Sequence, residues 1–412
     1  MMIAFKGFEF VEGGVCAPEG FQASGVHCGL RRNRNKPDLA LIYSPVPCKA
    51  AAVYTQNKVK GAPLQVTKEH LAAGDIQAVI VNSGNANTCN PDGEEKARAM
   101  CGLIARELEI PETAVAVAST GVIGEVLPLE PIESACPQLK KELSPEGNDQ
   151  AALAIMTTDT VKKEVAVTFQ LGGKTCRLGG MAKGSGMIHP NMATMLCFLT
   201  TDAALEPRLL QLALSAVTGD TFNMVSVDGD TSTNDMVLLM ASGQAGNPVI
   251  RNPASEDYKT FQDALYAVMM NLSREIARDG EGASKLLECM VSGAADEASA
   301  KVVAKSVITS SLFKSAMFGE DANWGRILCA VGYAQAELDP EQVEVTLKSQ
   351  NGKVLVCRKG RGVPFSEEVA KEVLRAGEIQ ILIRLGDGEG KAVAWGCDLT
   401  YDYVKINGSY RT

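Results

Sequence analysis

The segment Lys183–Leu196 combines a glycine-rich turn with a single threonine that could act as a nucleophile. Thr194 stands after the turn, at the head of the apolar run Met195–Leu199, which is typical of a buried strand. Its hydroxyl could attack the carbonyl of Ala193 and cut the chain there. The freed α-amine, with an ordinary pKa of about 7.7–8, would then act as base for the same hydroxyl. The glycines fit this chemistry, because an acyl shift in the backbone needs a contorted conformation.

Histidine and cysteine chemistry is not indicated by the sequence. The three histidines, His27, His70 and His189, are too widely spaced for a helical metal pair, and nothing suggests a Ser-His-Asp triad or a zinc site, although both stay open. No two of the twelve cysteines form a CxxC pair, and most lie in apolar runs. Cys101, Cys197 and Cys329 are examples. Small buried thiols in a reducing compartment explain this pattern better than disulfides do.

Two polar loops resemble phosphate or metal loops but lack the defining spacing. Val81–Asn87 and Asp228–Asp235 are rich in Gly, Asn and Asp. Neither matches a P-loop or a dinucleotide-binding fingerprint, and the EF-hand pattern fails for want of its terminal glutamate. We therefore interpret both as turns that shape a pocket, with no metal.

Alternating strands and helices are expected to position these segments, so the fold class is α/β (α+β) with large sheets. The pattern predicts strands at Gln77–Val81, Ala114–Ala118 and Val237–Met240, and hairpins of Val165–Gln170 with Thr175–Leu178 and of Val343–Leu347 with Val354–Cys357. Helices are predicted after Pro91, with Ala97, Met100, Cys101, Ile104 and Leu108 on one face, and at Leu209–Val217 and Phe261–Ile276. Near the end, Gln380–Leu385 is predicted to pair with a long strand over Ala392–Ile406.

Length and charge exclude several functional classes. A chain of 412 residues with 46% hydrophobic content can bury a large core, and we expect two substantial lobes. The net charge of -9 argues against binding to nucleic acid or to an anionic membrane surface. No stretch approaches the roughly 18 apolar residues of a membrane span. Because Met1–Lys6 lacks the features of a secretion signal, we expect a cytoplasmic protein.

The chain also resembles the bacterial ornithine acetyltransferases, which are often also glutamate N-acetyltransferases of arginine biosynthesis. The resemblance rests on Met181–Met187 with Ala193–Leu196, which is similar to the family's self-cleavage segment. Further similar segments, in the family's order, are Val81–Asn87, Ser119–Gly124, Ala154–Thr160, Asp228–Asp235, Asn323–Arg326 and Tyr401–Asn407. Any one of them is weak evidence, whereas the ordered set covers most of the chain.

The resemblance implies a fold and an activity. It implies a layered α-β-β-α sandwich of the ornithine acetyltransferase / DmpA-like type, cleaved into two intertwined chains, an α chain 1–193 and a β chain 194–412, that assemble as α2β2. The implied reaction moves acetyl from N2-acetyl-L-ornithine to L-glutamate through an acetyl ester on Thr194. No bound cofactor is implied. Acetyl-CoA is implied as a further acetyl donor, although no particular residue argues for it.

The resemblance also implies roles for individual residues. It makes Thr194 the nucleophile, Ala193-Thr194 the cleavage site, and Thr120 with Gly121 the oxyanion hole. The implied substrate-binding residues, Thr194 among them, are Thr157, Lys183, Glu281, Asn407 and Thr412. Whether Glu281 binds an amine or transfers a proton stays open.

Alternatives from other classes remain at this point. The same N-terminal threonine could serve an amidase or aminopeptidase, if water reached the acyl-enzyme. A monofunctional ornithine acetyltransferase of another pathway would carry the same motifs. An uncleaved relative that only binds a partner is the third alternative.

Overall fold

Two sheets and their covering helices make up the chain, whose computed structural model describes residues 2–31, 33, 36–189 and 195–409. The first sheet contains β1 (Glu9–Phe10), β2 (Gln22–Val26), β3 (Leu39–Tyr54), β4 (Ile76–Asn82), β5 (Val115–Ser119), β6 (Lys163–Leu171), β7 (Lys174–Lys183), β8 (Leu196–Thr201) and β10 (Met236–Ala241). The second contains β9 (Val225–Ser226), β11 (Leu286–Ala294), β12 (Glu344–Ser349), β13 (Gly352–Arg358), β14 (Arg361–Gly362), β15 (Glu378–Arg384) and β16 (Gly390–Cys397). The α-helices are α1 (Ala62–Ala73), α2 (Gly93–Leu108), α3 (Glu130–Lys141), α4 (Asn148–Ile155), α5 (Pro207–Asp220), α6 (Glu256–Arg278), α7 (Glu297–Thr309), α8 (Ser311–Phe318), α9 (Trp324–Gly332), α10 (Glu367–Leu374) and α11 (Tyr401–Ser409).

The long strand β3 joins two halves of the first sheet. Its first part pairs with β2 and β4, its last part pairs with β10, and the register shifts between Tyr43 and Cys48. Pro45 and Pro47 lie at this break, where proline, which cannot donate a ladder hydrogen bond, is tolerated. One half of the sheet therefore holds β2, β4 and β5, and the other holds β10, β8, β7, β6 and β1.

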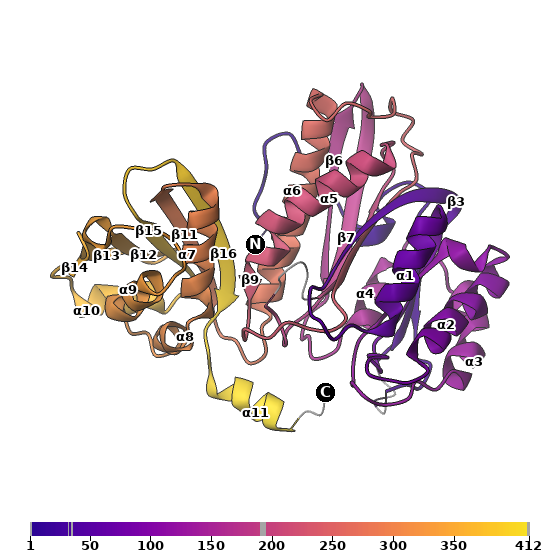
Figure 1. The fold of residues 1–412 in the computed structure, drawn as a ribbon, viewed down its shortest axis with the longest axis horizontal. Coiled ribbons are helices and arrows are strands. Elements are labelled where there is room, and N and C mark those ends of the chain that lie inside the picture. Colours follow the sequence, from indigo (N-terminus) through magenta and orange to yellow (C-terminus); the bar gives the residue numbers. More distant parts are fainter. Residues whose placement is uncertain (1, 32, 34–35, 190–194, 410–412) are drawn as a thin grey trace.

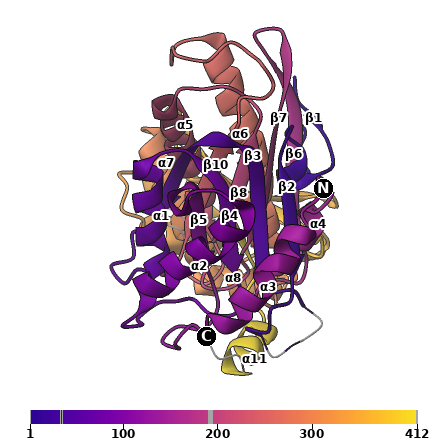
Figure 2. The same ribbon diagram turned by 90° about the vertical axis from the view of Figure 1, so that its right-hand side faces the viewer.

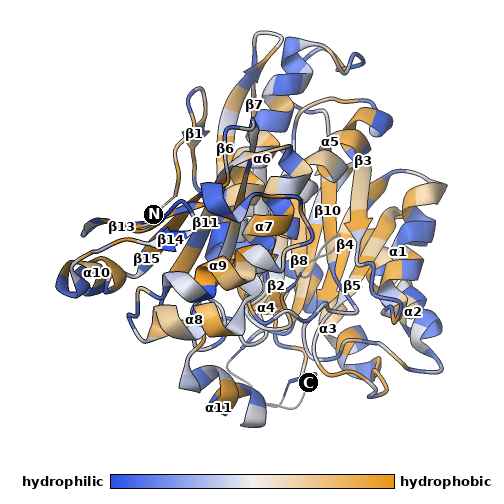
Figure 3. Cartoon of the chain, turned by 60° about the vertical axis from the view of Figure 1, so that its left-hand side comes forward, coloured by the Kyte–Doolittle hydropathy of each residue, from blue (hydrophilic) through white to orange (hydrophobic). Residues whose placement is uncertain are grey.

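The alternation of side chains along the strands shows that these halves pack face to face. On β10, Leu238 shares an apolar cluster with Val79 of β4, so this cluster lies between the two halves. Val237 of β10 points the other way, toward α5 and α6. Ile80 of β4 points outward to α2 and α3. The resulting order of layers is helix, strand, strand, helix, which confirms the predicted α-β-β-α sandwich. In Figure 3 the central strands are predominantly hydrophobic, whereas α1 and α2 carry hydrophilic residues as well.

The second sheet forms a further lobe that shares α6 with the sandwich (Figure 1). Helix α7 packs on β11 and β16. The buried carboxylate of Glu288, on β11, accepts hydrogen bonds from Arg274 of α6, from Trp395 Nε1 at 2.9 Å and from Gln380 Nε2 at 2.9 Å. A buried charge needs such partners to offset its desolvation. This cluster therefore fixes α6 to the second sheet.

Most predicted elements are confirmed, and two expectations near the end of the chain are wrong. The segment Gln380–Leu385 does not pair with the strand that follows it, because β11 lies between β15 and β16 and hydrogen-bonds to both. The predicted long strand Ala392–Ile406 ends at Cys397, and α11 follows it. The Thr400 hydroxyl accepts the Asp402 N–H at 3.2 Å, which starts the helix. Figure 2 shows α11 at the lower end of the molecule.

The cysteines and the helices agree in part with the sequence predictions. Nine of the twelve cysteines are buried free thiols, but Cys329 is exposed, contrary to expectation. The reason is helical phase, because α9 buries Ile327, Ala330 and Val331 instead. In the part of the chain that the structure describes, no helix has the length and apolarity of a bilayer span.

Candidate functional site

A cavity of about 140 Å³ lies where seven separate segments of the chain meet. Its walls come from the loop after β4, the loop after β5, the turn after α4, the end of β7, the loop before β10, the loop after α6, and α11. The residues that line it include Thr120, Gly121, Thr157, Lys183, Gly186, Asp228, Ser232, Asn234, Glu281, Tyr403 and Asn407. The sheet explains the convergence, because β7 ends where β8 and β10 begin, with Lys183 paired to Leu196 and Leu196 to Met236.

Thr120 and Gly121 follow β5, and Gly121 has a backbone conformation that only glycine adopts easily. The φ of Gly121 is +128°, and a Cβ there would lie 2.7 Å from the carbonyl carbon of Gly84. Side chains at this position would therefore clash with backbone. Lys183 Nζ donates to Thr120 Oγ1 at 3.5 Å. Because that contact uses an acceptor lone pair, the proton of the Thr120 hydroxyl remains available as a donor.

Lys183 is a buried residue at the end of β7, not the solvated surface lysine that is usual for this residue type. Burial lowers the pKa of Lys183 below its usual value, and the charge of Lys163 adds to this effect, while Asp159 and Asp235 oppose it. The side chain is therefore held in a weakly solvated position where a substrate anion would be a favourable partner.

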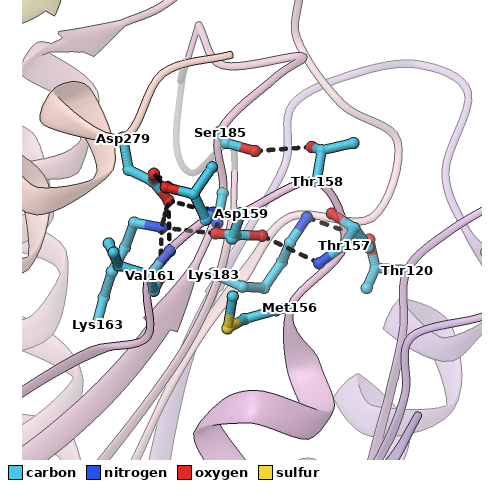
Figure 4. A network of polar contacts seen from close by, with 12 residues as sticks. Thr120, Met156, Thr157, Thr158, Asp159, Val161, Lys163, Lys183, Ser185 and Asp279 are labelled. Carbon is cyan, nitrogen blue, oxygen red and sulfur yellow. Dashed lines mark hydrogen bonds and ion pairs between the residues drawn. The ribbon is translucent and has the colours of Figure 1, made fainter. Parts of the chain in front are cut away.

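The carboxylate of Asp159 joins two walls of the cavity (Figure 4). It accepts the Gly184 N–H at 2.7 Å and the Thr157 N–H at 3.0 Å. It also accepts from Lys163 Nζ at 2.7 Å, and Lys163 Nζ in turn contacts Asp279 at 2.6 Å. The turn that carries Thr157 is thereby fixed to the segment that carries the glycines.

The charge state of Asp159 follows from these neighbours. Burial alone would raise the pKa of Asp159, but the positive charges of Lys163 and Lys183 and the hydrogen bonds hold this pKa well below its usual range. The side chains of Asp159 and Lys163 are both fully buried. Their ion pair is therefore little screened by solvent, and loss of one partner would leave the other charge uncompensated.

Glu281 also lines the cavity and lies against Gly186. A Cβ on Gly186 would come within 2.3 Å of the Glu281 carboxyl carbon, so the glycine makes this approach possible. Glu281 is only 8% exposed, and its Oε2 accepts a hydrogen bond from Asn407 Nδ2 at 2.7 Å. The remaining acceptor capacity of this carboxylate faces the cavity, which suits an amine.

Asp228 holds the glycine-rich loop and is a residue to which the sequence assigned no individual role. Its carboxylate accepts the Met187 N–H at 2.6 Å and the Ile188 N–H at 2.9 Å. Met187 has a φ of +56°, which is unusual for a residue with a side chain. Tyr403 of α11 also donates to Asp228, at 3.2 Å. The interpretation of Asp228–Asp235 as a turn that shapes the pocket is therefore confirmed, and Asp228 is the residue that acts in it.

Of the predicted site residues, the structure brings Thr120, Gly121, Thr157, Lys183, Glu281 and Asn407 to this one cavity. Asn407 reaches it from α11, not from the end of a strand as expected. Ala193, Thr194 and Thr412 lie outside the described residues. The described neighbours of the proposed cleavage site are anchored, because His189 Nδ1 contacts Ser226 Oγ at 3.1 Å and Met236 N donates to Met195 O at 3.0 Å.

Sequence reasoning missed the residues that hold the site together. Asp159, Lys163 and Asp279 were not singled out, since their pairing spans up to 116 residues along the chain. Asn234 donates through Nδ2 to the Ser119 carbonyl at 2.9 Å and so fixes the end of β5. A carboxylate and a lysine four residues apart, as in Asp159 and Lys163, are the only local signal that could have suggested the pair. Among the described residues, no group of three His, Cys, Asp or Glu side chains is arranged to hold a metal ion.

We predict that Asp159→Asn lowers the free energy of unfolding by about 3–5 kcal/mol at pH 7, because it removes one partner of a buried ion pair. The pKa of Asp159 is lowered in the folded protein, so its contribution is complete above the unfolded pKa of about 3.9 and is lost as the pH falls below it. Urea unfolding at pH 7 and below pH 4 measures both effects.

Asp149→Asn is the matched control for this prediction. Asp149 pairs with Lys162, and their side chains are 57% and 40% exposed. Exposed pairs contribute about 0–1 kcal/mol. Equal losses for the two variants at pH 7 would contradict the assignment of a special role to Asp159.

Comparison with known proteins gives consistent results over almost the whole chain. A family model described as "ArgJ family" matches residues 22–412. The arginine biosynthesis bifunctional protein ArgJ of Symbiobacterium thermophilum is 52% identical over 406 residues, 98% of this chain and 100% of the relative. The protein of the same name from Bacillus subtilis is 50% identical over 404 residues, 98% of this chain and 97% of the relative. A crystal structure of arginine biosynthesis bifunctional protein argJ from Bacillus halodurans shows 47% identity and a TM-score of 0.49, covering 52% of this chain and 98% of that one.

Proposed function

The chain belongs to the ArgJ family of arginine-biosynthesis acyltransferases, and we propose that it transfers acetyl from N2-acetyl-L-ornithine to L-glutamate through an ester on Thr194. One observation carries the proposal. Donors at Thr120 and Gly121, a buried lysine and a buried carboxylate line a single cavity. Met195, the residue after Thr194, lines a smaller cavity that also has Thr120 and Lys183 in its walls. The nucleophile is therefore proposed at the residue directly next to the groups that an acyl transfer needs.

The first proposed reaction is self-cleavage. The Thr194 hydroxyl attacks the carbonyl of Ala193, the amide becomes an ester, and water then releases residues 1–193 from 194–412. Support comes from the anchored flanks of this segment, because Asp228 holds Met187 and Ile188 and β10 holds Met195. Fixing the described residues on both sides favours an intramolecular attack, because positioned groups react faster than free ones.

The second proposed reaction is acetyl exchange. The hydroxyl of Thr194, activated by its own amine, attacks the acetyl carbonyl of acetylornithine. The Gly121 N–H and the Thr120 hydroxyl stabilise the oxyanion, and Lys183, which already donates to Thr120 Oγ1, keeps that hydroxyl oriented. Ornithine leaves with a proton from the Thr194 amine, and the amine of glutamate then attacks the ester to give N-acetylglutamate.

The charges of the cavity fit substrates that carry both an amine and a carboxylate. Glu281 offers acceptor oxygens beside Asn407, and Lys183 offers a cation on the wall that carries Thr120. We assign amine binding to Glu281 and carboxylate binding to Lys183, with Thr157 and the C-terminal Thr412 completing the substrate contacts. The proposal also includes acetyl-CoA as a second acetyl donor, no bound cofactor, assembly of the two fragments as α2β2, and a cytoplasmic location.

We predict that denatured protein separates into two polypeptides, residues 1–193 and 194–412, when examined by intact mass spectrometry. After trapping with acetylornithine, the second polypeptide should gain about 42 Da, the mass of one acetyl ester. Thr194→Val, which keeps the shape of the side chain but removes its hydroxyl, is the control and should give one uncut chain without the adduct. A cut chain in that variant would overturn the assignment of Thr194.

Thr120→Ala is expected to reduce kcat/KM about 10²- to 10³-fold, the usual effect of losing one oxyanion donor. Thr120→Ser retains the hydroxyl and should recover most of this loss. Steady-state kinetics with acetylornithine and glutamate, together with a melting curve for each variant, test this. A nearly normal rate for folded Thr120→Ala would remove Thr120 from the oxyanion hole.

Incubation with acetylornithine in the absence of glutamate distinguishes a transferase from a hydrolase. The transferase should release about one ornithine per site and then stop until glutamate is added, because water is a poor acceptor in the proposed site. A quantitative acetate assay makes the distinction. Continuous acetate release at the full turnover rate would favour an N-terminal-threonine amidase.

A further inference from the structure

A second, smaller cavity of about 20 Å³ adjoins the proposed reaction site. Its walls include Thr120 and Lys183, which also line the larger cavity, and Met195, which follows Thr194 in the chain. Among the described residues that line it, Asp235 is the only one with a carboxylate. Glu281, by contrast, lines only the larger cavity.

Strand pairing fixes Asp235 beside the residue that follows the nucleophile. Asp235 directly precedes β10, and the next residue, Met236, donates its N–H to Met195 O at 3.0 Å. Met236 is also in register with Leu196. On the other side, the Asp235 carbonyl accepts the Thr55 N–H at 3.0 Å. The backbone of Asp235 is therefore held from two sides, and its side chain has little freedom to leave the small cavity.

The carboxylate of Asp235 is buried and lacks a hydrogen-bond donor on one oxygen. The residue is 2% exposed, and Oδ2 has no partner among the described residues. An unpartnered buried carboxylate oxygen is costly, because it has given up water without a replacement. Nearby charged and polar groups do act on this carboxylate. Burial raises the pKa of Asp235 well above its usual range, while Ser232, Lys183 of β7, Thr55 and the Met195 N–H act in the opposite direction.

We propose that Asp235 is a positioning residue for the amine that self-cleavage creates at Thr194: its unpartnered oxygen accepts a hydrogen bond from that amine and orients it toward the Thr194 hydroxyl. The inference rests on the proposed self-cleavage. Before the cut, the nitrogen of Thr194 is an amide within the chain. After the cut, it is an amine with additional N–H donors, and it is attached to Met195, which lines the same small cavity as Asp235. Cleavage thus supplies the donor that the carboxylate lacks.

The role follows the logic of a nucleophile, a base and a third group that orients the base. When the hydroxyl of Thr194 attacks, its proton passes to the amine, and the resulting ammonium carries a positive charge beside Asp235. The same proton then leaves with the ornithine amine, so that the enzyme returns to its starting state. Lys183 cannot take this part, because an ammonium is only a donor, and Glu281 does not line the small cavity that holds Met195.

The test compares Asp235→Asn with wild type in two backgrounds, the self-cleaving chain and the uncut Thr194→Val chain. In the cleaved enzyme, kcat should fall at least about tenfold while KM for acetylornithine stays within about threefold, since the lost interaction matters mainly in the transition state. The Tm should fall in the cleaved enzyme, where a hydrogen bond to the amine is lost. In the uncut Thr194→Val background it should not fall, because there the substitution only removes an unpartnered acid.

Asp202→Asn is the matched control. Asp202 is also a buried acid, 3% exposed, at the opposite end of β8, and its carboxylate accepts the Arg177 N–H at 2.7 Å and the Glu19 N–H at 3.1 Å. Burial raises the pKa of Asp202 as it does that of Asp235. Because its partners do not depend on cleavage, Asp202→Asn should lower the Tm in both backgrounds and leave kcat unchanged.

Each other outcome is decisive. If cleaved Asp235→Asn has a normal kcat, or if its Tm falls equally in both backgrounds, Asp235 is only a structural residue and the inference is wrong. If Asp235→Asn stays uncut, Asp235 acts before the amine exists, which also overturns the inference. An uncut wild-type chain in the same intact-mass measurement would instead refute the proposed self-cleavage itself.

Discussion

The buried ion pair of Asp159 and Lys163 is the interaction on which the site depends. Both side chains are fully buried, so the pair is stable only while every partner is present. The Asp159 carboxylate also accepts hydrogen bonds from the N–H groups of Thr157 and Gly184. This buried ion pair and the hydrogen bonds of Asp159 therefore hold the proposed substrate-binding turn after α4 at a fixed distance from the glycine-rich end of β7. Neither segment could move without leaving a buried charge unpaired.

The sequence predicted the parts of the fold that local pattern controls. Strand β4 and the apolar face of α2 follow from the spacing of Val79, Val81, Ala97, Met100 and Ile104, because burial on one face dictates that spacing. The pairing of β15 with β11 instead of with β16 has no such local sign, since β11 enters from about ninety residues earlier in the chain. The helix α11 was not predicted, because it buries no side chain and so has no apolar face that the sequence could reveal.

Within the site, too, residues that belong to a local sequence pattern could be predicted, whereas residues defined by distant partners could not. Gly121 and Gly186 could be marked from the sequence because their neighbours form recognisable loops, and the structure supplies the physical reason, a backbone contact for one and the Glu281 carboxylate for the other. Asp228 and Asp235 could not be distinguished from ordinary turn residues, because what separates them is which partner lies opposite. Asp228 meets two N–H groups of the glycine-rich loop, whereas Asp235 Oδ2 meets none in the described chain.

These differences in partners also separate the roles of the acids around the cavity. Asp159 and Asp228 have their oxygens occupied by backbone donors and so can only hold structure. Glu281 keeps one bond to Asn407 and faces the larger space, where a substrate amine fits. Asp235 faces the smaller space beside Met195. These carboxylates therefore have different roles because the fold gives them different numbers of hydrogen-bond donors. The carboxylate of Asp235, one oxygen of which has no donor among the described residues, lies where the proposed cleavage would create a new one.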